Sequence, residues 1–151
     1  MKRCLLILSL LPFFFTAKAQ QDPVSWEFIV EKGDQPNAFT FLLKAKPEPG
    51  WFIYSQHLDP DAGPIPTSVH FNPSDNLIIE GHVQESGNKK EGYDELFGTQ
   101  IAKFSGLTVF SQSIRLNGDK GMLSGYVEYM TCNDEQCLPP RQVSFSALFP
   151  N

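Results

Sequence analysis

The chain has 151 residues and carries 17 acidic against 12 basic side chains, which gives a formal net charge of -5. An acidic balance without clustered Lys and Arg argues against nucleic acid as a partner, because phosphate-backbone recognition depends on clustered basic side chains. An apolar fraction of 41%, with 13 phenylalanines, indicates a packed interior and excludes a disordered chain.

The first nineteen residues have the features of a cleaved signal peptide. Lys2 and Arg3 form a basic start, Leu5 to Phe15 are apolar, and Ala17-Lys18-Ala19 provides a small-x-small cleavage site. The apolar run is shorter than the roughly 20 residues that a membrane-spanning helix needs. We therefore expect export, cleavage after residue 19 and no stable membrane insertion. Cys4 precedes the apolar run, so no lipid anchor is expected there.

Residues 20–151 are expected to form a single domain with one core. Segments rich in apolar and aromatic side chains, which alternate with polar ones in residues 25–31, 39–45 and 142–149, predict β-strands separated by Gly and Pro turns. These segments are residues 25–31, 39–45, 51–55, 67–71, 77–83, 107–116, 122–131 and 142–149. The first two are expected to pair as a hairpin closing at Gly33 to Pro36. Seven to nine short strands without a helical period predict an all-β fold, an immunoglobulin-like two-sheet β-sandwich.

Residues 84–98 interrupt this series of strands. They are mostly polar and include Ser86 to Gly92, so we interpret them as an irregular loop. The loop nevertheless contains the cluster Tyr93-Asp-Glu-Leu-Phe97. Apolar side chains in a polar loop predict a lid over another part of the surface.

Cys132 and Cys137 flank a turn-forming segment, Asn133 to Gln136, at the tip of a predicted hairpin. In an oxidising compartment such a pair is expected to form a disulfide unless it is reduced. As a staple it is weak, since closing so short a loop restricts the unfolded chain by about 2 kcal/mol, against about 3 for fifteen residues. An exposed disulfide is also open to exchange. Spacing alone therefore leaves a structural staple and a redox pair as alternatives, and it leaves the isomer of the bonds before Pro139 and Pro140 open.

Other candidate sites are weaker. His57, His70 and His82 do not have the spacing of metal ligands, so no metal is expected. Asp59 to Gly63 resembles the start of a calcium loop, but His70 occupies the position where a bidentate Glu is required. Trp51 and its aromatic neighbours are candidates for a sugar- or peptide-binding surface, although aromatic residues of a sandwich are more often core. No cofactor is expected.

The pattern Tyr-x-x-Cys-x4-Cys-Leu-Pro-Pro, ending at Pro140, follows the earlier segment Asp94-Glu-Leu-Phe-Gly98. Together these segments resemble the N-terminal periplasmic domain of the thiol:disulfide interchange protein DsbD. The resemblance extends from the strand that ends at Tyr54 to the final strand. Its specific part is the cysteine segment and the Asp-Glu loop.

The resemblance implies a periplasmic domain whose Cys132 and Cys137 cycle between dithiol and disulfide. It implies that Cys137 forms the mixed disulfide with partners and that Cys132 resolves it. Asp94, Glu95, Leu96 and Phe97 would form a cap loop that shields the cysteines until a partner displaces it. Phe52 and Tyr54 would line the site.

The resemblance also implies the partners. Electrons are expected to come from a thioredoxin-like or membrane thiol reductase on a separate chain and to pass to exported disulfide-containing proteins. Two differences from the family pattern stand out: the loop between the cysteines is one residue shorter than in well-known members, and Leu96 aligns with an aromatic residue at the cap tip. A non-catalytic immunoglobulin-like binding module with a structural hairpin disulfide is the alternative.

Overall fold

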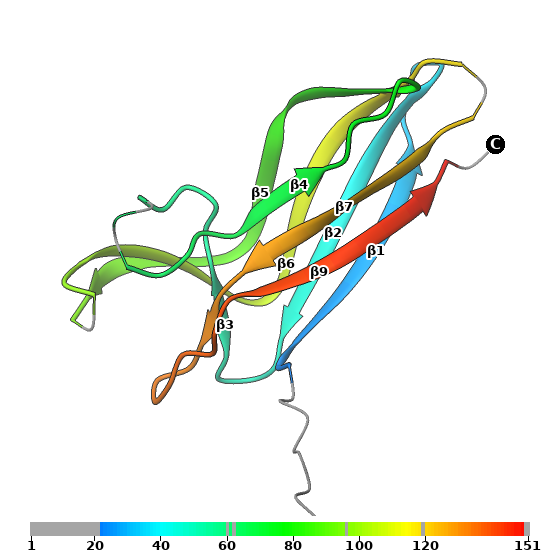
Figure 1. Ribbon diagram of the computed structural model, residues 1–151. Helices are drawn as coiled ribbons and strands as arrows, with labels where there is room; N and C mark the ends of the chain where they lie inside the picture. The colour runs from blue at the N-terminus through cyan, green and yellow to red at the C-terminus, as the bar shows by residue number, and fades with distance from the viewer. Residues whose placement is uncertain (1–21, 60, 62, 96, 119, 150–151) are drawn as a thin grey trace, which may run out of the picture.

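The computed structural model describes residues 22–59, 61, 63–95, 97–118 and 120–149. Its described part contains two antiparallel sheets that face one another, as Figure 1 shows. The strands are β1 (Val24–Lys32), β2 (Ala38–Pro47), β3 (Phe52–Tyr54), β4 (Ser68–Phe71), β5 (Leu77–Asp94), β6 (Thr99–Leu116), β7 (Met122–Tyr129), β8 (Thr131–Cys132) and β9 (Arg141–Leu148). The predicted all-β, immunoglobulin-like sandwich is confirmed, whereas the expected signal segment lies outside the described residues.

The strand order explains how the layers are built. The larger sheet runs β1-β2-β6-β3-β8, with β5 on the other edge of β6, and the smaller sheet runs β4-β7-β9. β1 and β2 pair antiparallel, as the sequence predicts. No helix in the described part of the chain is long and apolar enough to cross a bilayer. No described peptide bond is cis, so the bonds before Pro139 and Pro140 are trans.

The core lies between the sheets and is formed by alternate side chains of each strand. On β2, Phe41 and Leu43 are fully buried, and their neighbours in sequence point outward. Phe110 of β6 and Phe145 of β9 close the core from two sides, and the rings of Phe41 and Phe145 lie 4.9 Å apart. Burial of each such side chain contributes about 1.5 to 3 kcal/mol. The alternation expected for β2 and β9 is confirmed.

The interpretation of residues 84–98 as an irregular loop is wrong. β5 and β6 remain paired from Leu77 and Leu116 to Asp94 and Thr99, so residues 84–94 continue a strand. Apart from Glu85 and Asp94, the side chains of this outer part are exposed on both faces, which is why no period of two is visible in the sequence. The outer part forms an arm that projects beyond the sandwich in Figure 1.

A bulge marks the point where the arm leaves the sandwich. Gly87 pairs with Thr108, but Asn88 pairs with Ser105, so two residues of β6 remain unpaired between them. One of these is Gly106, whose φ of 70° is left-handed and therefore suits glycine. Bulges bend strands, and the hairpin turns away from the sandwich here (Figure 1).

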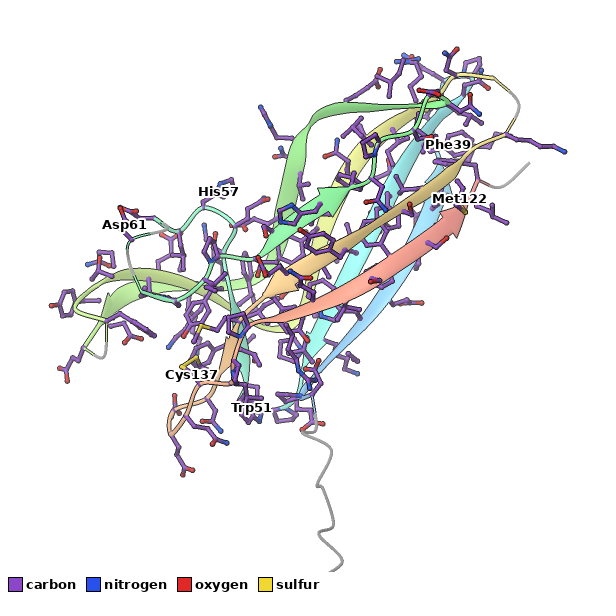
Figure 2. The ribbon with its side chains drawn as sticks, in the orientation of Figure 1. Phe39, Trp51, His57, Asp61, Met122 and Cys137 are labelled. Carbon is purple, nitrogen blue, oxygen red and sulfur yellow. A yellow bond between two sulfur atoms is a disulfide. The ribbon has the colours of Figure 1, made fainter. Side chains whose placement is uncertain are left out.

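The predicted strand 122–131 divides between the two sheets. β7 pairs with β9 in the smaller sheet, whereas β8 pairs with β3 in the larger sheet. The chain changes sheets at Met130, the residue between β7 and β8. This change places Cys132 directly opposite Phe52. Figure 2 shows Cys137 and Trp51 at one end of the sandwich, opposite the end that carries Phe39 and Met122.

Candidate functional site

Cys132 and Cys137 form a disulfide across a short hairpin, with their α-carbons 4.0 Å apart. Thr131 O accepts a hydrogen bond from Leu138 N, and Asn133 N donates one to Gln136 O, each at 2.9 Å. The cysteines therefore occupy a non-hydrogen-bonded position of an antiparallel pair, where α-carbons approach most closely. For this reason the separation falls below the range of about 4.4 to 6.8 Å usual for disulfides.

Asn133 organises the tip of this hairpin. Its Oδ1 accepts hydrogen bonds from the backbone N–H of Glu135 at 2.9 Å and of Gln136 at 2.8 Å. Such bonds are typical of Asn in turns. The tip residues Asp134, Glu135 and Gln136 are exposed. The prediction that Asn133 to Gln136 form a solvated turn is confirmed.

The two cysteines differ in their exposure to solvent. Cys132 is 1% exposed, whereas Cys137 is partly exposed. The expectation of an exposed pair is therefore wrong for Cys132, because β8 joins the larger sheet and is covered by Tyr54 and its neighbours. An incoming thiol meets Cys137 first.

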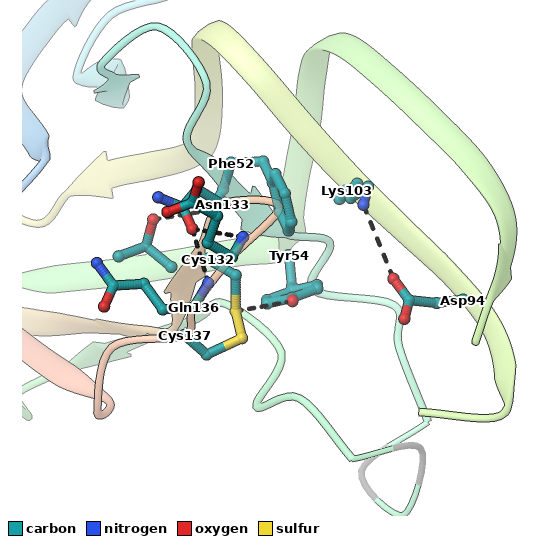
Figure 3. Close-up of a disulfide and its surroundings, with 10 residues drawn as sticks. Phe52, Tyr54, Asp94, Lys103, Cys132, Asn133, Gln136 and Cys137 are labelled. Carbon is teal, nitrogen blue, oxygen red and sulfur yellow. Dashed lines mark hydrogen bonds and ion pairs between the residues drawn. A yellow bond between two sulfur atoms is a disulfide. The ribbon is translucent and has the colours of Figure 1, made fainter. Parts of the chain in front are cut away.

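Tyr54 contacts the buried sulfur directly. Its hydroxyl donates a hydrogen bond to Cys132 Sγ at 3.0 Å, as Figure 3 shows. Burial, and after it the negative charge of Asp94, raises the pKa of Tyr54 well above its ordinary value. The phenol therefore keeps its proton, and with it the ability to donate, far into the alkaline range.

Phe52 and Lys103 continue the site across the sheet. Phe52 lies opposite Cys132 in the β3–β8 pair, and Lys103 lies opposite Tyr54 in the β3–β6 pair. Lys103 Nζ lies 3.9 Å from the centre of the Phe52 ring and 3.8 Å from Asp94 Oδ2. The first is a cation–π contact that joins the arm to Phe52 of β3, and the second is an ion pair between two residues of the arm (Figure 3). No sequence pattern singles out Lys103, because the strand predicted in this part of the chain begins only at residue 107.

Phe97 lies in the turn between β5 and β6 and packs over Tyr54, with ring centres 6.3 Å apart. On its other side is Gly63, where an added methyl carbon would lie 2.5 Å from Phe97 Cδ1. The ring is thus held between β3 and the loop after it. Of the other predicted cap residues, Asp94 is partly buried and Glu95 is exposed. Leu96 lies outside the described residues.

A cleft of about 170 Å³ brings these side chains together. It is lined by Phe52, Tyr54, Asp94, Phe97, Lys103, Cys132, Asn133, Asp134 and Cys137. Among the described residues, the cleft therefore contains every predicted site residue except Glu95. It adds Lys103, Asn133 and Asp134. Both sulfurs, a phenol donor and a cation share one small volume beside solvent.

The histidines lie apart from this cleft. His70 stacks on Tyr126 with ring centres 4.5 Å apart, and His57 lines a separate depression beside Leu58 and Ile101. Within the described ranges there is no group of three or more His, Cys, Asp or Glu side chains suited to hold a metal ion.

Residues 18–148 match the family described as "Thiol:disulfide interchange protein DsbD, N-terminal". The chain belongs to this family. The match covers the cysteine hairpin, the arm and both sheets, so the resemblance based on two segments is confirmed for the domain as a whole. The family is one of thiol–disulfide exchange domains. No curated protein matches the sequence significantly.

Several solved structures share the fold. The reduced DsbD N-terminal domain of Neisseria meningitidis is 17% identical with a TM-score of 0.51, over 82% of this chain and 86% of that one. The N-terminal periplasmic domain of ScsB from Proteus mirabilis is 14% identical with a TM-score of 0.57, over 87% of this chain and 47% of that one. A complex of the DsbD and PilB N-terminal domains from Neisseria meningitidis also matches, at 17% identity and a TM-score of 0.50, over 86% of this chain and 88% of that one.

Proposed function

We propose that this domain transfers reducing equivalents by thiol–disulfide exchange at Cys132 and Cys137. One observation carries the proposal: the buried sulfur of Cys132 receives a hydrogen bond from Tyr54, while its partner Cys137 is partly exposed in the same cleft. A hairpin staple needs neither the difference in exposure nor the phenol. Family membership supports the same chemistry.

In the first half of the reaction a donor thiolate attacks Cys137 Sγ. A bond forms between the donor sulfur and Cys137 Sγ, the bond between the two cysteines breaks, and Cys132 leaves as a thiolate. The Tyr54 hydroxyl stabilises this leaving group through its hydrogen bond. A second donor thiolate then attacks the mixed disulfide, so the donor leaves oxidised and the domain is left as a dithiol after proton uptake.

In the second half the direction reverses. Cys137, as the thiolate, attacks one sulfur of an oxidised target and releases the other target sulfur as a thiolate. Cys132 then attacks Cys137 Sγ, which restores the disulfide of the domain and leaves the target reduced. Cys137 is thus the sulfur that bonds to partners, and Cys132 is the one that resolves the mixed disulfide.

The arm supplies the cap in this proposal. Phe97 covers Tyr54 and lines the disulfide cleft, so a partner must displace the tip of the arm to reach the sulfurs fully. Leu96 and Glu95 complete the proposed cap loop. The shield limits reaction with small thiols and oxidants that cannot displace it.

The proposed setting is the periplasm. It is supported by the signal-like residues 1–19 and by the ScsB relative, which is described as a periplasmic domain. The donor is a thioredoxin-like protein or membrane thiol reductase, and the targets are exported proteins with disulfides. That a family member forms a complex with the PilB N-terminal domain supports docking of a separate domain.

Trapping of the mixed disulfide tests the proposal. With Cys132→Ser, reduced protein and an oxidised peptide disulfide should accumulate a covalent adduct, because the resolving sulfur is absent. The matched variant Cys137→Ser should give far less adduct, since Cys132 is buried. Intact mass under non-reducing conditions measures both. Equal trapping would contradict the assigned roles. No trapping, with a reduction potential below about -300 mV, would leave a structural bridge in a non-catalytic binding module.

A further inference from the structure

The disulfide lies at one end of a row of side chains that crosses four strands of the larger sheet. Lys90 of β5 is opposite Lys103 of β6, Lys103 is opposite Tyr54 of β3, and Phe52 of β3 is opposite Cys132 of β8. Side chains of directly opposite residues lie on the same face of a sheet, as do residues two apart on one strand. One continuous face therefore joins the sulfurs to the two lysines.

A second cleft lies on this face beside the disulfide cleft, and we call it the basic groove. It has a volume of about 290 Å³ and is lined by Gly50, Trp51, Phe52, Lys90, Lys103, Ser105 and Asp134. It shares Phe52, Lys103 and Asp134 with the disulfide cleft. The two clefts thus form one continuous surface. Aromatic side chains of residues 51–54 line one part of it, and Lys90 and Lys103 of the arm line another.

Lys90 and Lys103 are destabilising as a pair unless negative charges nearby offset their repulsion. Like charges directly opposite on paired strands repel each other, and Lys103 has Asp94 3.8 Å away. For Lys90, no carboxylate within 4.0 Å is found in the described residues. The neighbouring Lys89 differs, since Glu91 at 2.8 Å and Glu85 at 3.6 Å neutralise it. In a chain of net charge -5, Lys90 is therefore a local positive charge on the same sheet face as the disulfide.

We propose that the basic groove binds an acidic side chain in an extended segment of the redox partner, near the partner's reactive cysteine. This inference rests on the proposed exchange function. Lys90 and Lys103 supply the charge complementary to a carboxylate, and Trp51 and Phe52 supply apolar contact for its neighbours. Asp134, which borders both clefts, repels an acid placed next to the reacting sulfur.

The sheet geometry sets the position of the acid. From Cys137, Lys103 is reached by crossing to β8, then β3, then β6, and neighbouring strands lie about 4.8 Å apart, so the backbones of the two residues lie about 14 Å apart across the strands. An extended segment advances about 3.3 Å per residue. The acidic residue is therefore expected about four positions from the partner's cysteine.

Three peptides test this assignment. They are identical except for Glu, Gln or Lys four positions from a single cysteine, which carries a neutral hydroxyethyl disulfide. Reduced protein attacks this disulfide through Cys137, hydroxyethyl thiol leaves, and Cys132 then releases the peptide thiol. The second-order rate should be about 3- to 10-fold higher for the Glu peptide than for the Lys peptide at low salt, and the ratio should approach one at high salt.

The variant Lys90→Gln should lower this ratio, whereas the matched variant Lys89→Gln, whose lysine is already paired, should keep it. Because both rates come from one protein sample, any loss of folded protein cancels from the ratio. A ratio near one for the unmodified protein would overturn the groove while leaving the exchange function intact. Loss of the ratio with inorganic phosphate, but not with sodium chloride at equal ionic strength, would also overturn it, in favour of a free-anion site.

Failure of the exchange function itself looks different, because none of the peptides would then react. In that case the groove can be tested alone, by titrating the oxidised protein with a Glu peptide that has no cysteine. Tryptophan fluorescence monitors the binding, and the Trp26→Phe background leaves Trp51 as the one emitting tryptophan. A change in Trp51 emission that Lys90→Gln abolishes supports the groove. No change overturns it.

Discussion

At the Cys132 sulfur, the hydroxyl of Tyr54 supplies something that the neighbouring ring of Phe52 cannot, a hydrogen bond. The 3.0 Å contact is made inside a buried cluster. Hydrogen bonds to a charged group contribute about 1.5 to 3 kcal/mol. Tyr54 therefore favours the thiolate that Cys132 becomes when the disulfide opens, against the burial that disfavours any charge there.

Tyr54→Phe should consequently slow exchange. If roughly half of the lost stabilisation is felt in the transition state, as for leaving-group effects in thiol exchange, the rate falls about 3- to 10-fold. Because the pKa of Tyr54 is raised, the deficit should persist as pH passes 10, where an ordinary phenol would already lose its proton. Stopped-flow kinetics of the reduction of the domain's disulfide by a cysteine peptide thiol across this pH range measures the effect.

Tyr129→Phe is the matched control for this variant. Tyr129 is equally buried, but its hydroxyl donates to Asp22 Oδ2 at 2.5 Å and not to sulfur. It should lose stability without losing exchange rate. Equal slowing in both variants would show that Tyr54 acts only through packing.

Among the elements, the β5–β6 arm does most to shape the site. It carries Phe97, Asp94 and Lys103, and it is fixed to β3 by a buried carboxylate. Glu85, whose side chain is 6% exposed, accepts hydrogen bonds from the Ser55 hydroxyl at 2.6 Å and from Gln56 N at 2.9 Å. The base of the arm is thus anchored one residue beyond Tyr54, while its tip rests on the site through one aromatic ring.

Truncation of that ring should open the cleft without loosening the base of the arm. Phe97→Ala is expected to raise the rate at which dithiothreitol reduces the disulfide by about 3- to 10-fold, because exchange depends on access to the sulfur. Tyr93→Ala is the control. This side chain is 64% exposed on the same arm and does not line the disulfide cleft, so its removal should leave the rate unchanged. A rate for Phe97→Ala equal to that of the control would rule out a shielding role for the ring.

At the scale of the whole molecule, the sequence predicts the features that depend on a single chain segment, such as a strand with one face against the core. The alternation at Phe39, Phe41, Leu43 and Ala45 predicts β2 and its buried face. In the structure these four side chains are buried, and the residues between them are more exposed to solvent. The polar, turn-forming composition of Asn133 to Gln136 likewise predicts the turn. Family membership was predicted from the cysteine segment and the Asp94 to Gly98 segment.

Features that depend on pairing between distant segments could not be read from the sequence. The arm cannot be predicted from its sequence, because its outer strands face solvent on both sides and so carry no apolar period. Lys103 was missed because only the register of β6 against β3 and β5 places it beside Phe52 and opposite Lys90. The burial of Cys132 depends on the change of sheet at Met130. Nothing local in residues 129–132 signals that change.

This division between core and site leads to a last prediction, on stability. The core cluster around Phe41 and Phe110 contains neither cysteine, so the fold should persist without the disulfide. In Cys132→Ala/Cys137→Ala the unfolded chain regains the freedom that the short loop removed, about 2 kcal/mol. For a domain of this size that corresponds to a fall in Tm of about 5 to 10 °C. Thermal unfolding followed by circular dichroism measures it, with the strand signal expected to remain native at 25 °C. Failure of the double variant to fold would make the disulfide a requirement of the structure and would contradict the proposed exchange, in which this disulfide opens.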